Sequence, residues 1–314
     1  MEASTLGNIR VIDTAYRDTL ISPTFYVFLF IFMFFTIIGC IIAIFKSIFF
    51  TSVSNPAELA DNNIDNKIIG VLPNVTDDEL KDERFLQAIE SLVVNVKATI
   101  NNDTEDTSLA KTILVTSSTA GNGKSFISRH ISKKLSDLDN KVILLDLDLK
   151  RGIQHKEFAK KPIDKRDFIN IPKDGYEKFK TDNGSYLIPK IKNLSSSFEF
   201  LYSSEFSNVI AFLKSHFDYI VIDTAPILSV SDTSVLISSA DYNFTVVRHG
   251  MTKINDVKQA ISTVNQLGKT FEGIIYNDYK KPSSYYGYYG LYGDYGYQYY
   301  AKKYLYETYD YKEN

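Results

Sequence analysis

Cysteine and tryptophan are the scarcest residues of this 314-residue chain, which has one cysteine, Cys40, and no tryptophan. A single cysteine excludes a disulfide framework and a cysteine-based metal site. Basic residues are not in excess either, because 35 lysines and arginines face 38 acidic residues, for a formal net charge of −3. A general nucleic-acid binder would carry a basic excess. The length suits one globular domain of ordinary size with additional segments.

Charge is missing from one long stretch, residues 25–45, which read FYVFLFIFMFFTIIGCIIAIF. A helix of this length spans about 30 Å, the thickness of the hydrocarbon core of a bilayer. A signal peptide would have a short basic segment before it and a cleavage site of small residues after it. Here residues 1–24 are mixed in character and bulky Phe and Ile follow, so the sequence predicts a transmembrane helix at 25–45.

Residues 46–105 are expected to form a juxtamembrane linker and a helix. Pro56, Pro73 and clusters of Asn and Asp indicate a linker in residues 46–83, and helical apolar spacing follows in 85–100. Beyond these, apolar runs alternate with amphipathic stretches, which indicates a parallel sheet covered by helices on both faces. The expected strands are 111–117, 141–145, 219–222, 242–247 and 271–276, and the expected helices are 124–138, 196–214 and 254–267. The fold class is therefore α/β.

The strongest motif is the phosphate loop Ser118–Ser125, between an expected strand and an expected helix. Its glycines let backbone N–H groups turn toward phosphate oxygens, and the helix N-terminus adds partial positive charge. Lys124 can reach the terminal phosphates, and the Ser125 hydroxyl can bind Mg²⁺. A glycine-containing turn with a surface lysine is the plain alternative. The expected nucleotide-binding residues are Ser118, Thr119, Ala120, Gly121, Asn122, Gly123, Lys124, Ser125 and Phe126.

Two further strand ends carry acids. Asp146 and Asp148 follow the apolar run Val142–Leu145, and Asp223 follows Tyr219–Ile222. Ligands of open α/β sheets lie beyond the carboxyl ends of the strands, so the three loops should meet at one crevice. A carboxylate after a strand and next to a phosphate loop is well placed to hold Mg²⁺ or its waters.

These motifs resemble the Walker A, A′ and B motifs of bacterial tyrosine autokinases, the BY-kinases of capsule and exopolysaccharide systems. Within this family the chain most resembles the single-chain proteobacterial form, and the resemblance extends to residues 8–13, 151–155 and 248–250. The resemblance implies a P-loop NTPase-type sheet in residues 106–277, with ATP and Mg²⁺ as ligands. ParA- and MinD-type ATPases share the loops, but not a membrane anchor followed by a tyrosine-rich tail.

The resemblance is imperfect at several positions. Lys150 stands where the family usually has Arg, and Ala225 replaces the first proline of the Walker B motif. The helix that builds the family's ring has the pattern Glu-x-x-Arg-x-x-Arg, which should fall at Gln87, Glu90 and Val93, and all three positions differ. The first transmembrane helix and large periplasmic domain of the full-length form are not found, so the chain is expected to be a natural short form, a fragment or a truncation.

The resemblance also implies roles for individual residues. Lys124 would stabilise the transferring phosphoryl group, while Ser125, Asp148 and Asp223 would hold Mg²⁺. Asp146 would receive or orient the tyrosine hydroxyl, although Asp146 and Asp148 could exchange roles. Asn277, expected just after the last strand, lies where related proteins contact adenine; a strand-end cap is the alternative.

The outlier in composition is tyrosine, because 15 of the 22 tyrosines fall between Tyr276 and Tyr311. Residues 278–314 form a tail almost free of aliphatic side chains. Such a tail could be a low-complexity adhesive segment or a surface for stacking RNA bases. Its lack of arginine weakens the RNA reading, and tyrosines beside a nucleotide site are more simply substrates. The candidate phosphate acceptors are Tyr285, Tyr286, Tyr288, Tyr289, Tyr292, Tyr295, Tyr297, Tyr299, Tyr300, Tyr304, Tyr306, Tyr309 and Tyr311.

Together these features predict a tyrosine kinase held in the inner membrane by one helix. The positive charges that flank the helix do not decide its orientation. An ATP site must face the cytoplasm, which makes residues 1–24 an extracytoplasmic stub. The resemblance implies that phosphorylation of its own or a neighbour's tail regulates polysaccharide export, with the export machinery and a tyrosine phosphatase as partners and no nucleic acid. The alternatives are a membrane-bound ATPase of the ParA/MinD kind and a nucleotide-binding scaffold without turnover.

Overall fold

The computed structural model describes residues 23–50, 52–76, 82–101, 109–182 and 184–280. They fall into two units, residues 1–51 and residues 52–314. The expected stub at 1–24 lies almost wholly outside the described residues, and so do all the candidate phosphate acceptors of the tail.

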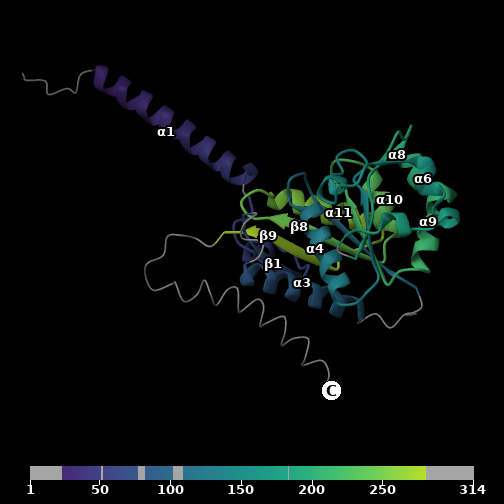
Figure 1. Ribbon diagram of the computed structural model, residues 1–314. Coiled ribbons are helices and arrows are strands. Elements are labelled where there is room, and N and C mark those ends of the chain that lie inside the picture. Colours follow the sequence, from purple (N-terminus) through teal and green to yellow (C-terminus); the bar gives the residue numbers. More distant parts are fainter. Residues whose placement is uncertain (1–22, 51, 77–81, 102–108, 183, 281–314) are drawn as a thin grey trace, which may run out of the picture. The chain divides into compact units, whose positions relative to one another are not determined.

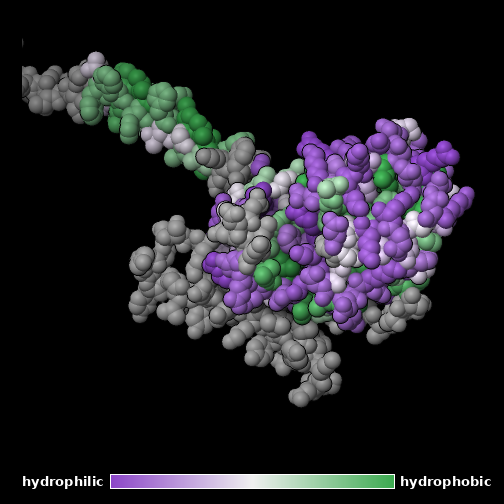
Figure 2. Space-filling model, in the orientation of Figure 1, coloured by the Kyte–Doolittle hydropathy of each residue, from purple (hydrophilic) through white to green (hydrophobic). Residues whose placement is uncertain are grey.

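The first unit is built on helix α1, Pro23–Phe50. Its stretch Thr24–Phe45 is long and apolar enough to cross a membrane, and it is the one such helix in the described part of the chain. Large apolar side chains are exposed all around it, Phe30 and Phe32 at 72% each, and Figure 2 shows it as a hydrophobic rod. A soluble helix would bury at least one apolar face. The helix is therefore a candidate membrane span.

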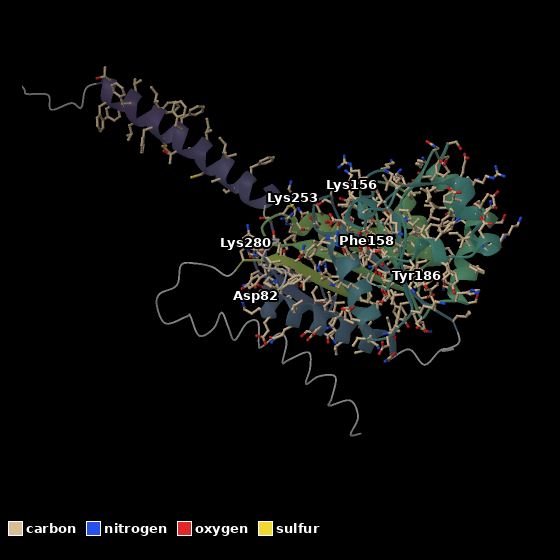
Figure 3. The ribbon with its side chains drawn as sticks, in the orientation of Figure 1. Asp82, Lys156, Phe158, Tyr186, Lys253 and Lys280 are labelled. Carbon is tan, nitrogen blue, oxygen red and sulfur yellow. The ribbon has the colours of Figure 1, made fainter. Side chains whose placement is uncertain are left out.

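The second unit contains a seven-stranded sheet in the order β1-β9-β8-β2-β7-β3-β5. Every pairing within it is parallel, which confirms the predicted α/β class. The strands are β1 Ile68–Pro73, β2 Lys111–Ser117, β3 Val142–Leu147, β5 Tyr186–Ile188, β7 Tyr219–Thr224, β8 Tyr242–Arg248 and β9 Gly273–Tyr279. Tyr186 and Lys280, labelled in Figure 3, lie near its opposite edges.

Helices cover both faces of the sheet, because alternate side chains of each strand point to opposite sides. Ile113 and Val115 of β2 pack with α3, Glu83–Asn101, and α4, Lys124–Asp137, which lie side by side (Figure 1). Leu114 between them faces the opposite core. The helices on that side include α8 Ser197–Leu201, α9 Ser204–Lys214, α10 Asp232–Ser239 and α11 Ile254–Gln266.

Short elements fill the connection from β3 to α8, where the sequence predicted no regular structure. They are α5 Gln154–Glu157, β4 Ile163–Asp164, α6 Lys165–Ile169, α7 Ile171–Asp174, the 3₁₀ helix η2 Glu177–Phe179, β5 and β6 Ile191–Lys192. Strands β4 and β6 form a separate two-stranded parallel sheet.

Three sequence expectations need correction. The linker reading of residues 46–83 is wrong where α2, Ala57–Asp61, and β1 form, because β1 pairs with β9 as an edge strand of the sheet. The single helix expected over 196–214 is broken, since Ser203 caps a second helix by accepting the N–H of Phe206 at 3.2 Å. Strand β9 continues to Tyr279, so Asn277 lies inside the strand and not after it.

Candidate nucleotide site

The loop between β2 and α4 has the backbone shape that its glycines allow. Gly121 and Gly123 have φ angles of +85° and +93°, a left-handed region that other residues rarely adopt. Gly123 immediately precedes α4, and a Cβ atom there would collide with the side-chain nitrogen of Asn277. Both glycines are therefore required by conformation, and the second also by the close approach of β9.

Side chains from β8 and β9 hold this loop in place. Arg248 Nη1 donates to the Gly121 carbonyl at 2.8 Å, and its Nε donates to the Asp278 carboxylate at 2.8 Å. Asn277 Nδ2 donates to the Asn122 carbonyl at 3.0 Å. The contact made by Asn277 in this structure is thus with the phosphate loop, which fixes the loop against the end of the sheet.

A cavity of about 530 Å³ opens beside the loop. Its lining includes Ala120, Gly121, Gly123, Lys124, Ser125 and Phe126 from the expected nucleotide-binding set, together with Asp148. Ser118 and Asn122 are buried at 2% and 0% exposure and do not line the cavity. The Thr119 carbonyl accepts a hydrogen bond from the Ser117 hydroxyl at 2.6 Å. A volume of this size is typical of small-molecule sites.

The three predicted acids lie at different depths. Asp148 lines the cavity. Asp146 and Asp223, paired in register across β3 and β7, are both completely buried. Burial, and then the charge of Asp223, raises the pKa of Asp146 to about 8. Burial also raises the pKa of Asp223, to about 6, against the opposing hydrogen bonds of Ser125 and Gln154. Two adjacent carboxylates resist ionising together unless a cation is near.

Lys124 supplies one such cation. It is 7% exposed, and burial lowers its pKa, while Asp223 and Asp148 act in the opposite direction. The lysine is therefore held between the acids and the cavity. Asp146 Oδ1 and Asp223 Oδ1 are buried, and neither has a hydrogen-bond partner within the described part of the chain.

Ser125 and Asp148 at the cavity lining and the unpartnered Oδ1 of Asp223 are oxygen ligands that suit a hydrated divalent cation, which keeps several waters and takes few protein ligands. The described residues contain no group of three or more His, Cys, Asp or Glu side chains that could hold a metal ion by themselves. A cation at this site would therefore need water or phosphate oxygens to complete its coordination.

Gln154, at the start of α5, is a site residue that the sequence analysis did not assign. Its Nε2 donates to Asp223 Oδ2 at 2.9 Å and to the Ser125 carbonyl at 2.7 Å, and its backbone N–H donates to Asp146 Oδ2 at 3.0 Å. The fully buried side chain therefore joins the phosphate loop to Asp223, and the backbone of the same residue holds Asp146. The family resemblance included residues 151–155, but nothing in the sequence indicated which of them would contact the acids.

Comparisons with known proteins agree with this arrangement. Residues 110–276 match the family model of an AAA domain. The tyrosine-protein kinase CpsD of Streptococcus pneumoniae is 30% identical over 171 residues, and the match covers 75% of that protein and 53% of this chain. The chain belongs to the bacterial tyrosine kinases.

More distant members of this tyrosine-kinase family match a larger part of the chain. The tyrosine-protein kinase Ptk of Acinetobacter johnsonii is 25% identical over 306 residues, which cover 91% of this chain and 41% of Ptk. This chain therefore spans less than half the length of that relative. The kinase domain of Escherichia coli Etk superposes with a TM-score of 0.63 at 20% identity, and the match covers 76% of this chain and 98% of that domain. That likeness shows the shared fold.

Proposed function

We propose that this chain is a membrane-anchored protein-tyrosine kinase that transfers the γ-phosphate of ATP to tyrosines of its own or a neighbour's C-terminal tail. The observation that carries the proposal is the position where the tail begins. Strand β9 contacts the phosphate loop through Asn277 and ends at Tyr279, and the tyrosine-rich segment follows directly in the sequence. The tyrosine-rich segment therefore continues from a strand that contacts the phosphate loop.

The reaction breaks the bond between the γ-phosphorus and the bridging oxygen of ATP and forms a bond between that phosphorus and a tyrosine oxygen. ADP leaves, and the hydroxyl proton passes to a carboxylate. Catalysis of such transfers depends on positioning and on neutralising charge. The backbone of Ser118–Ser125 binds the phosphates, and Lys124, which lines the cavity, stabilises the transferring group.

Ser125, Asp148 and Asp223 would hold Mg²⁺, directly or through water, and the bound ion would neutralise phosphate charge. Asp146 is proposed to receive or orient the tyrosine hydroxyl, because its raised pKa gives its carboxylate more basicity than an ordinary one. Asp146 is buried behind Gly152, whose Cβ position would collide with its carboxylate. Access to Asp146 therefore requires the turn at Gly152 to move. Asp148 already lines the cavity.

The membrane placement is part of the same proposal. Helix α1 would cross the inner membrane once, with the kinase domain in the cytoplasm and the residues before it outside. As the family resemblance implies, phosphorylation of the tail would regulate polysaccharide assembly and export and would be reversed by a phosphatase. The domain boundaries at residues 46, 106 and 278 remain predictions.

Incubation of the purified chain with ATP and Mg²⁺ separates this proposal from its alternatives. A kinase consumes ATP and becomes labelled in a phosphotyrosine blot. A ParA- or MinD-like ATPase consumes ATP without labelling, and a scaffold does neither. Lys124→Met should abolish labelling while circular dichroism shows an unchanged fold; near-normal labelling of that variant would refute the assignment of the nucleotide site.

A further inference from the structure

A second hollow, of about 620 Å³, lies next to the nucleotide cavity. Lys150 lines both, so the two hollows are neighbours at the turn after β3. The second hollow is lined from three sides, by residues 149–150, by residues 190–198 and by the start of α10. We name it the lysine groove after Lys150, Lys190 and Lys192.

The lysine groove is positively charged. Its three lysines face one lining acid, Asp232, which is 5% exposed. Lys190 Nζ donates to the Lys150 carbonyl at 2.8 Å. The charge of Lys190 also opposes the rise in the pKa of Asp146, so Lys190 lies within electrostatic range of the active-site acids. The groove therefore attracts anions toward the nucleotide cavity.

Lys192 is the lysine best placed to meet a ligand. The carboxylate nearest to it in the described structure is that of Asp164, with Nζ and Oδ2 3.9 Å apart, and the two side chains are 49% and 51% exposed. An exposed pair at this distance contributes little. An incoming anion could therefore recruit the ammonium group of Lys192 without breaking a strong interaction.

Aromatic surface accompanies this charge. Phe198 lines the groove and is 45% exposed, and its ring centroid lies 4.8 Å from that of Tyr202, which is 65% exposed. Exposed aromatic rings beside lysines suit a ligand that is itself both aromatic and anionic.

We infer that the lysine groove binds phosphotyrosine of the segment 281–314, from the same chain or a second copy. This inference rests on the proposed kinase function. Each phosphorylated tyrosine carries about −1.5 to −2 charge near neutral pH, with three strong acceptor oxygens. The 34 residues after Lys280 can extend over roughly 110 Å, so the segment is long enough to reach the groove within one chain or across to a neighbour.

Occupation of the groove would favour phosphorylation of several neighbouring tail tyrosines one after another. Successive tail tyrosines from Tyr286 onward are one to four residues apart, which corresponds to at most about 14 Å of extended chain. Because the groove and the cavity share Lys150, a phosphotyrosine held in the groove presents a following tyrosine to the ATP site. The groove does not speed transfer of the first phosphate to the tail, whereas it speeds each later transfer.

A binding experiment with a synthetic peptide tests the inference without relying on kinase activity. The probe is a fluorescent peptide of residues 291–300, with or without phosphate on Tyr295, titrated into the 314-residue chain in detergent. We expect the phosphorylated peptide to bind about tenfold more tightly. Lys192→Glu and Phe198→Ala should each weaken its binding at least about fivefold, because they remove the charge or the ring that the ligand meets.

Lys258→Glu, on the exposed side of α11, is the matched control and should leave binding unchanged. Equal affinity for the two peptides, or unchanged binding by Lys192→Glu, would overturn the inference. Displacement of the peptide by millimolar inorganic phosphate alone would also overturn it, by showing a general anion site. Failure of the chain to label itself with ATP, with peptide binding intact, would instead count against the proposed kinase function.

Discussion

At the scale of single residues, Gln154 connects features that are far apart in the sequence. Its amide donates to both Asp223 and the Ser125 carbonyl, so the positions of the phosphate loop and of Asp223 depend on the same side chain. Gln154→Leu should lower stability by about 2 kcal/mol, since it leaves buried acceptors without their donor. It should also reduce the rate of autophosphorylation more than about tenfold. Thermal melts and phosphotyrosine blots measure the two effects.

Gln154→Asn, which keeps the amide on a shorter side chain, distinguishes positioning from simple packing. If the amide positions Asp223, this variant should recover part of the rate. Recovery of stability without any recovery of rate would contradict the positioning role.

Asp146 and Asp148, the two acids at the end of β3, should differ in their contributions to catalysis and to nucleotide binding. Asp148 lines the cavity and Asp146 is completely buried. Asp148→Asn should therefore weaken Mg²⁺-dependent nucleotide binding, seen as a raised KM for ATP. Asp146→Asn should lower kcat by about a hundredfold or more with little change in KM, as expected for loss of a general base. Identical kinetic effects of the two variants would show that the proposed division of roles is wrong.

At the scale of elements, the packing of α3 on α4 places His130 in an apolar setting. Its ring meets Phe85 edge-on at 5.3 Å and lies 4.2 Å from Phe126. Burial lowers the pKa of His130 from 6.5 to about 4. The unfolded chain therefore takes up this proton first as the pH falls. The stability that depends on the neutral ring is fully present above about pH 6.5 and is lost between that pH and about 4.

His130→Gln should weaken this acid sensitivity. Between pH 7 and pH 4 the variant should lose up to about 3 kcal/mol less unfolding free energy than the unmodified chain. Urea denaturation at a series of pH values provides the measurement, and His216→Gln, at an exposed histidine, is the control. A pH profile identical to that of the unmodified chain would contradict the effect assigned to the apolar surroundings of His130.

Elements with long apolar runs could be predicted from the sequence, and short ones could not. β2 was predicted with its observed bounds, and α4 to within one residue, because a β-branched run and a glycine loop delimit them. β1 was missed since its six residues, IIGVLP, contain Gly and Pro and gain their order from pairing with β9. The meeting of the three motif loops was foreseeable from parallel topology. The Gln154 bridge was not, because it depends on tertiary packing alone.

At the scale of the whole molecule, α3 bears on self-association. Ring formation of the kind the family resemblance implies needs Glu at position 87 and Arg at positions 90 and 93, where this chain has Gln, Glu and Val. Here Glu90 pairs with Lys134 of α4 at 2.5 Å, and Val93 is buried at 1% exposure. The fragment that begins at Ser52 should therefore be monomeric or only weakly self-associating. Light scattering at micromolar concentration tests this, and a stable octamer would contradict it.

The central claim is that the tail of this protein is the substrate of its own nucleotide site. Intact-mass and peptide mass spectrometry of the purified chain, before and after incubation with ATP and Mg²⁺, measures this directly. The account predicts several added phosphoryl groups, all on tyrosines between Tyr285 and Tyr311, and none in the Lys124→Met variant. Consumption of ATP with no added mass on the tail would contradict it.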